Sequence, residues 1–197
     1  MNTLKAEKRS MDVKAKKLRR EGFVTGNLFG REIEGSITLK FTKKEIEVLL
    51  KNNNKGSQVM LELDGKTYDA LIKEVDYNPL AHTVEEVDFQ ALVSNEMVHS
   101  TAEIILENEE KVMSGVLQDE LKEVAYKALP ADLVDKIKVD VAGMKIGDTL
   151  RVSDLEIAKN KNIHITTDPE AVVATVTPVH NVVPETETEA EETAEEK

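Results

Sequence analysis

The sequence contains no cysteine and no tryptophan, and aromatic residues make up only 4% of its 197 residues. Without cysteine, the chain can form neither a disulfide framework nor a thiolate that acts as nucleophile or metal ligand, and we expect a reducing compartment. No apolar run approaches the roughly 20 residues that cross a bilayer. The opening stretch MNTLKAEKRS lacks the apolar core of a signal peptide. We therefore expect a cytoplasmic protein with no membrane partner.

Motifs of catalysis and cofactor binding are equally scarce. The chain has no GxSxG, P-loop or GxGxxG pattern, and its four histidines show no metal-binding spacing such as HExxH. Neighbouring carboxylates do occur, but Asp and Glu account for 38 of 197 residues, so such pairs arise by chance and do not indicate an acid–base dyad. We expect no enzyme activity, no cofactor, no bound metal and no small-molecule substrate.

Charge is the informative part of the composition. The formal net charge is −12, but residues 1–92 carry 16 basic and 15 acidic residues, whereas residues 93–197 carry 10 basic and 23 acidic ones. The first 20 residues alone have eight basic and two acidic side chains. Such asymmetry predicts a polyanionic partner at the N-terminal end and a solubilising surface at the other.

The basic residues gather in the segment KAKKLRREGF, which spans residues 14–23. Large apolar residues are few around it, so a helix here would be only weakly amphipathic, and an arm that folds against a partner fits the pattern better. Lysine can neutralise phosphate, and the arginine fork can also bind phosphates or base edges. A solvated basic face with no partner is the competing interpretation.

The rest of residues 1–92 predicts a small barrel-like α+β domain. Thr42-Lys43-Lys44-Glu45 fits a capping box that begins a helix. Val59, Leu61 and Leu63 alternate with polar residues before Asp64-Gly65, which predicts a hairpin with a type I′ turn. Residues 36–41 and 84–93 also alternate and indicate strands.

Residues 93–183 predict a second, mostly β domain, with extended segments such as 101–107, 137–141 and 172–177. From residue 184 onward the chain is PETETEAEETAEEK, which cannot bury enough apolar surface to order itself, so residues 184–197 are expected to be a disordered acidic tail. The predicted fold class is mainly β with α+β elements: an N-terminal small β-barrel with helices, then a β-rich C-terminal domain.

The order of several short strings resembles that of a known protein family. In the N-terminal half, these are Arg9, the basic cluster that ends Lys16-Lys17-Leu18-Arg19-Arg20-Glu21-Gly22, Leu28-Phe29-Gly30, Asn78-Pro79 and Asp88-Phe89. In the C-terminal half they are 115–118, 129–132, 140–143, 146–150, 152–155, 167–169 and 172–176. This succession, over roughly residues 3–178, resembles the bacterial large-subunit ribosomal proteins that bind 5S ribosomal RNA, in the long form called the general stress protein CTC.

The resemblance implies that the barrel grips 5S ribosomal RNA and that large-subunit ribosomal proteins are its other neighbours. Carried over by position, the implied RNA-binding residues are Arg9, Lys16, Lys17, Arg19, Arg20, Phe29 and Asp88, with Lys14 adding charge without a family counterpart. Phe29 stands in place of a tyrosine and keeps its stacking ability. The implied location is the cytoplasm, on the ribosome.

The sequence also departs from the family pattern. The family's QRHP is here Asp76-Tyr77-Asn78-Pro79, and the histidine of its HxDF is Glu86. The arginine pair has become Lys16-Lys17, which keeps charge and loses the bidentate fork. These changes leave an alternative from another class: a stress-linked, ribosome-associated protein–protein adaptor that uses the acidic second domain and binds RNA weakly.

Overall fold

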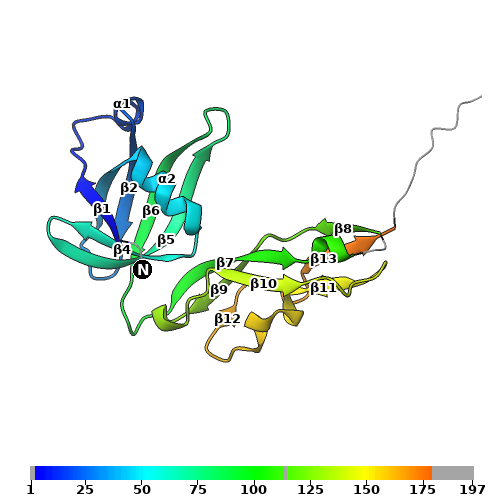
Figure 1. The fold of residues 1–197 in the computed structure, drawn as a ribbon. Helices are drawn as coiled ribbons and strands as arrows, with labels where there is room; N and C mark the ends of the chain where they lie inside the picture. The colour runs from blue at the N-terminus through cyan, green and yellow to red at the C-terminus, as the bar shows by residue number, and fades with distance from the viewer. Residues whose placement is uncertain (1–2, 113–114, 179–197) are drawn as a thin grey trace, which may run out of the picture.

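A computed structural model describes residues 3–112 and 115–178, and these confirm the predicted fold class (Figure 1). The N-terminal part is a closed barrel of six strands, which run in the order β1-β3-β2-β6-β5-β4. These strands are β1 (Thr3–Lys8), β2 (Phe23–Phe29), β3 (Ser36–Thr42), β4 (Gln58–Leu63), β5 (Lys66–Asn78) and β6 (Thr83–Ala91). The predicted acidic tail, 184–197, lies outside the described residues.

Alternation is clearest in β4 and in the second half of β6. In β6, Val87 and Phe89 are fully buried, while the alternate residues Glu86 and Asp88 point to the outer surface. The ring of Phe89 packs on that of Phe41 from β3 at a centroid distance of 5.5 Å, a tilted arrangement that suits the ring quadrupoles. Here the period of two separates core residues from those of the outer face, whereas β2 and β5 each bury three consecutive residues, at 24–26 and 70–72.

Two local predictions in the barrel are confirmed. The helix α2 (Lys43–Asn52) begins with the expected capping box, in which Thr42 accepts from the Glu45 N–H and Glu45 accepts from the Thr42 N–H. The β4–β5 hairpin turns through Asp64 and Gly65, whose φ angles of 50° and 78° are those that a type I′ turn requires.

The prediction of an N-terminal arm is wrong. Residues 3–8 form β1, which pairs antiparallel with β3 and parallel with β4 and so closes the barrel. Residues 15–20 form the short helix α1 (Ala15–Arg20). Leu4, Ala6 and Leu18 are buried, so the few apolar residues of this segment are enough to fix it to the barrel.

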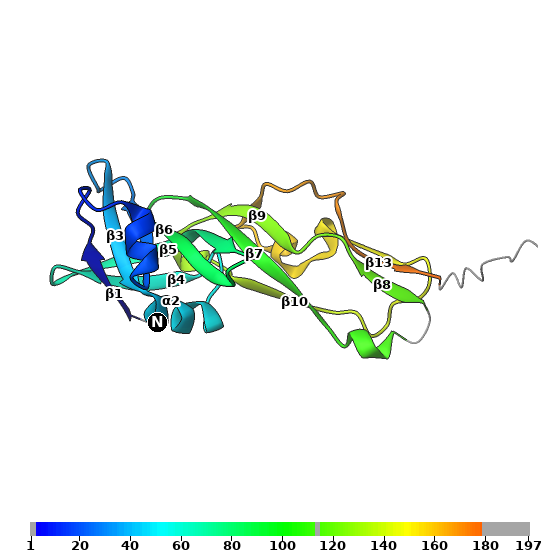
Figure 2. The ribbon, with the colours of Figure 1, turned by 90° about the horizontal axis from the view of Figure 1, so that it is seen from above.

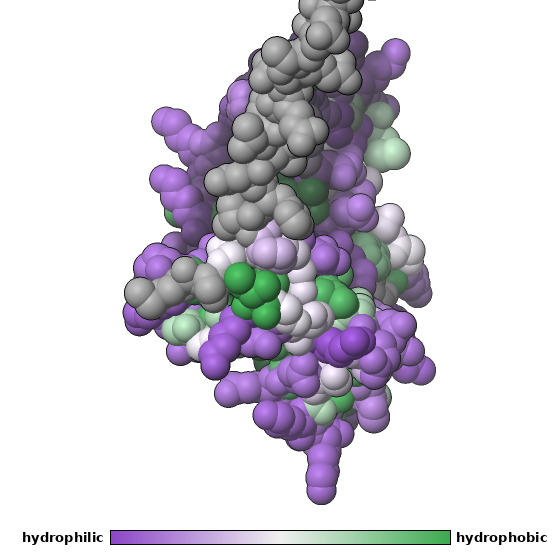
Figure 3. Space-filling view, turned by 90° about the vertical axis from the view of Figure 1, so that its right-hand side faces the viewer, coloured by the Kyte–Doolittle hydropathy of each residue, from purple (hydrophilic) through white to green (hydrophobic). Residues whose placement is uncertain are grey.

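The C-terminal part consists of two sheets, one with strand order β10-β7-β9-β12 and one with order β11-β13-β8. The strands are β7 (Val98–Glu107), β8 (Val116–Asp119), β9 (Glu123–Ala128), β10 (Lys136–Asp140), β11 (Thr149–Arg151), β12 (His164–Ile165) and β13 (Val172–Thr177). Short 3-10 turns lie at Glu109–Lys111, Pro130–Asp132, Val152–Asp154 and Glu156–Lys159. Figure 3 views this end of the molecule and shows a mainly hydrophilic surface with scattered apolar spots.

The two parts lie end to end, and the strands β7 and β9 run away from the barrel (Figures 1 and 2). The loop after α2 joins them: Asn54 donates to the Glu103 carboxylate, and Ser57 donates to Asp135 at 3.3 Å. Gly56 sits against the Thr101 carbonyl with no room for a Cβ atom. The loop therefore belongs to both parts of the structure.

Candidate nucleic-acid interface

The basic helix α1 packs at one end of the barrel through one buried apolar side chain. Leu18 is buried and α1 packs on β2, while Lys16, Lys17 and Arg20 point into solvent. Lys14, the residue before the first turn, is also exposed. Gly22, with φ +88°, then turns the chain into β2. Four exposed cations are thus fixed to the rigid barrel, on a helix that is too short to be stable alone.

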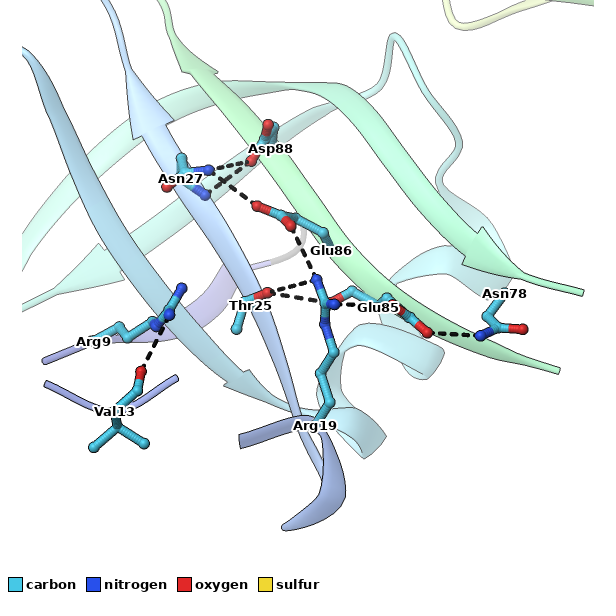
Figure 4. Close-up of polar contacts among 9 residues, drawn as sticks. All are labelled: Arg9, Val13, Arg19, Thr25, Asn27, Asn78, Glu85, Glu86 and Asp88. Atoms are coloured by element: carbon cyan, nitrogen blue, oxygen red, sulfur yellow. Dashed lines mark hydrogen bonds and ion pairs between the residues drawn. The ribbon is translucent and has the colours of Figure 1, made fainter. Parts of the chain in front are cut away.

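Arg19, in the same helix, points in the opposite direction and lies against the barrel (Figure 4). Its Nη1 is 2.9 Å from the Glu85 carboxylate and its Nη2 is 3.1 Å from that of Glu86. Nε donates to the Glu85 carbonyl at 3.2 Å, and Nη2 also donates to the Thr25 hydroxyl at 3.4 Å. The side chain is only 30% exposed. The guanidinium therefore joins α1 to β2 and β6, and its single positive charge is shared by two acidic side chains.

Asp88 lies further along the same outer face, bonded to β2. One of its oxygens accepts from both the N–H and the side-chain amide of Asn27, each at 3.0 Å. The Asn27 amide also donates to Glu86 at 3.2 Å, and the Asn78 amide donates to Glu85 at 2.7 Å. Each of these carboxylates has thus acquired a donor from the chain itself, which offsets the cost of placing them side by side.

Arg9 follows β1 at the edge of this face. Its guanidinium donates to the Val13 carbonyl at 3.1 Å, and its backbone exchanges hydrogen bonds with Thr38 of β3. Thr38 is in register with Asn27. Arg9 is half-buried, so it is held in place and shapes the loop that leads to α1.

Phe29 ends β2 on the same outward register as Thr25 and Asn27, and it lies opposite Gln90 of β6. The rise of a strand, about 3.3 Å per residue, places it roughly 20 Å from the start of β2 beside α1. The structure therefore brings the sequence-predicted residues to one face, with the basic helix at one end and the half-exposed aromatic ring at the other. We name this strip, from α1 through Thr25, Asn27 and Asp88 to Phe29, the polar face.

Sequence reasoning missed the partners that organise the polar face. Asn78 belongs to one of the strings that carry the resemblance, but no pattern shows what it bonds. Thr25, Asn27 and Glu85 are not among the implied RNA-binding residues. The alternation of β6 places Glu86 and Asp88 on one face, but only the pairing of β2 with β6 shows what lies opposite them.

The described residues give no support for a metal site or a membrane-spanning helix. No group of three or more His, Cys, Asp or Glu in residues 3–112 and 115–178 could hold a metal ion. Within the same ranges, no helix is long and apolar enough to cross a membrane. Fold and polar face together define a small closed β-barrel of the kind that offers a basic and polar surface to nucleic acid.

Comparisons with known proteins identify the family. Residues 4–89 match the model of the ribosomal L25p family, and residues 97–180 match that of the C-terminal domain of ribosomal protein TL5. The chain is 31% identical to the large ribosomal subunit protein bL25 of Moorella thermoacetica over 185 residues, which cover 91% of this chain and 86% of that one. It is also 31% identical to the bL25 proteins of Carboxydothermus hydrogenoformans and Bacillus velezensis, over 92% and 90% of this chain and 94% and 89% of theirs.

The chain belongs to the bL25 family of large-subunit ribosomal proteins, in its two-part long form. Membership confirms the expected structural, non-enzymatic class and the cytoplasmic, ribosome-associated location. The comparisons offer no support for the alternative of an adaptor with weak RNA binding.

Proposed function

We propose that the barrel, residues 1–92, binds 5S ribosomal RNA through the polar face, and that residues 93–183 form a separate C-terminal domain that faces neighbouring proteins of the large subunit. The observation that carries the proposal is the position of α1. A ribosomal protein with a net charge of −12 fixes its exposed Lys14, Lys16, Lys17 and Arg20 beside a strip of amide, carboxylate and aromatic side chains.

The residues of the polar face have different roles in this proposal. The exposed lysines and Arg20 neutralise phosphates and set the position of the barrel on the RNA, without reading sequence. Asn27 and Asp88 present an amide and a carboxylate, which can bond base edges where non-Watson–Crick pairs reshape an RNA groove. Phe29 offers a ring for stacking on an unpaired base or a sugar. Arg19 is a positioning residue, since its guanidinium is already engaged by Glu85 and Glu86.

Glu86 stands where the family has a histidine. Its negative charge is the reason why the pairing with Arg19 is needed. A carboxylate that faces phosphate is repulsive, but a carboxylate whose oxygen is paired with an arginine in the same chain presents little net charge. Arg19 thus offsets part of the negative charge of Glu85 and Glu86 between α1 and Asp88. This is consistent with RNA contact at a position where the sequence alone indicates repulsion.

A salt series tests the proposal. The full chain is titrated with 5S ribosomal RNA and with an unrelated RNA duplex of the same length at several salt concentrations. Four to five neutralised phosphates predict a log–log slope of affinity against salt with a magnitude of about 3 to 4. Selective binding to 5S RNA with that slope supports the proposal. Equal affinity for both RNAs, or a flat response to salt, contradicts it.

A further inference from the structure

A cavity of about 240 Å³ lies where the barrel meets the C-terminal part, away from the polar face. Its walls come from β5 of the barrel, from the loop after α2, and from β7 and β9. The volume is below the roughly 300–1,000 Å³ of pockets for drug-sized ligands, so it suits a small group. The charged and titratable residues in its lining are Lys55, Lys73, Glu74 and His99.

The sheet beside the cavity adds a row of basic side chains, one lysine between two histidines. On its exposed face, His99 of β7 is in register with Lys127 of β9, and Lys127 is in register with His164 of β12. All three side chains are exposed, and neighbouring strands lie only about 4.8 Å apart. Lys73 reaches this row from the barrel, since its Nζ donates to the His99 carbonyl at 2.8 Å.

Three acidic residues lie close to the lysines around the cavity. Lys55 forms a loose ion pair with Glu123 at 3.8 Å, and Glu74 follows Lys73 in β5. Glu103, in β7, is bonded to the Asn54 amide. Burial, the charge of Lys127 and the charge of Lys73 all lower the pKa of His99. Burial and the charge of Lys55 likewise hold the pKa of Lys73 below its usual value, with Glu74 opposing.

We propose that this cavity, with Lys73, His99, Lys127 and His164 around it, is an oxyanion site that binds a phosphate group. Lys73 and Lys127 approach the site from the barrel and from β9, and their ammonium groups attract a multiply charged anion. Lysine and histidine can both donate to phosphate oxygens, and the groups come from two parts of the chain, so a bound phosphate also fixes the barrel against β7 and β9. The phosphate could be that of a free phosphoanion or of an RNA backbone, and the chemistry of recognition is the same.

Histidine titration provides the first test. The pKa values of His99 and His164 in the full chain are followed by NMR of the imidazole carbons, with and without pyrophosphate at constant ionic strength. Binding raises the pKa of both rings, with saturation, because an anion favours imidazolium. His82, in the β5–β6 loop of the barrel, is the internal control and stays unchanged.

Two variants test whether pyrophosphate binding depends on the charge of Lys127. Lys127→Gln removes one exposed charge from the row and weakens pyrophosphate binding about tenfold, whereas Lys145→Gln removes the same charge from a distant turn and has no effect. Both positions are exposed, so both variants are expected to fold.

The second arm uses RNA. The affinity of the Lys127→Gln and Lys145→Gln chains for 5S ribosomal RNA is compared at one salt concentration. A selective loss with Lys127→Gln assigns the phosphate to an RNA backbone, and a pyrophosphate effect alone assigns it to a free phosphoanion. If pyrophosphate produces no saturable shift and Lys127→Gln binds RNA as Lys145→Gln does, the proposal is overturned. The RNA-binding proposal for the polar face survives that outcome, because it depends on α1 and not on β9.

Discussion

Arg19 and Glu86 form an ion pair across 67 residues of sequence, with Nη2 3.1 Å from the carboxylate oxygen. The pair joins the basic helix to the barrel and places a negative charge where the family has a histidine. Glu85 holds the same guanidinium from the other side at 2.9 Å. The position of α1 and the charge of the polar face therefore both depend on Arg19.

Removal of one carboxylate from this cluster should strengthen RNA binding. In Glu86→Gln, the amide can still accept from Arg19, while the face loses one negative charge. A unit charge 5–10 Å from a phosphate in water is worth about 0.4–0.8 kcal/mol, so affinity for 5S ribosomal RNA should rise about two- to fourfold at low salt. Glu156→Gln, an exposed position of the C-terminal part, is the control. A fall in affinity for Glu86→Gln alone would mean that the carboxylate itself contacts the RNA.

The exposed lysines of α1 should contribute affinity without selectivity. Lys17→Gln removes one phosphate contact, so the salt slope should decrease in magnitude by about 0.7–0.9. Affinity for 5S ribosomal RNA and for an unrelated duplex should fall by the same factor. Lys145→Gln serves as the charge-matched control in filter-binding measurements. A loss confined to 5S RNA would assign Lys17 to base recognition instead.

Arg19 should matter more for stability than its neighbour in the helix. Arg19→Ala leaves Glu85 and Glu86 side by side, half-buried and without their cation, and should cost the barrel about 1–2 kcal/mol. Arg20→Ala, at an exposed position, should cost less than about 0.5 kcal/mol. Urea unfolding followed by the amide signals of β2 and β6 measures both. Equal effects of the two variants would show that the cluster adds nothing to stability.

Gly56 should control the junction between the two parts. A Cβ atom there would overlap the Thr101 carbonyl oxygen. Gly56→Ala should therefore separate the barrel from β7, seen as a larger radius of gyration in X-ray scattering with unchanged circular dichroism. Gly65→Ala carries the same strain of a positive φ, 78° against 89°, but nothing lies near its Cβ position. An unchanged radius for Gly56→Ala would argue against a fixed junction.

Tyr126 should make the C-terminal part sensitive to alkali. Burial raises the pKa of its hydroxyl, which donates to the Val134 carbonyl at 2.6 Å and accepts from the Val134 N–H at 2.8 Å. Because the folded state holds this proton more tightly than the unfolded chain, stability is retained below about pH 10 and falls as the pH rises above it.

The variant Tyr126→Phe separates this effect from the titration of lysines. It should cost about 1–3 kcal/mol at pH 7, since two backbone groups of Val134 lose their partner. Between pH 9 and 11 it should lose less stability than the original chain does. Urea unfolding at several pH values gives both numbers. Identical pH profiles would mean that the hydroxyl titrates normally.

Local features of the barrel were predictable because their causes are local. The Thr42–Glu45 capping box and the Asp64-Gly65 turn involve residues within three positions of one another, so the sequence contains both partners of each contact. The family motifs and the charge of residues 14–20 likewise indicated the surface through which we propose that RNA is bound. Extended segments after residue 93 predicted the second, mostly β part, and the order of the motifs agreed with it.

The sequence by itself determined the start of α2, the turn between β4 and β5, the strands with clean alternation and the charge gradient. Tertiary structure decided the rest, because closure of the barrel pairs β1 with β4 in parallel over more than 50 residues. Leu4 and Ala6 are too short an apolar pattern to predict a strand, yet that pairing buries both. The same closure sets α1 beside β6, so that Arg19 meets Glu85 and Glu86. No spacing in the sequence encodes such contacts, since they depend on which strands become neighbours.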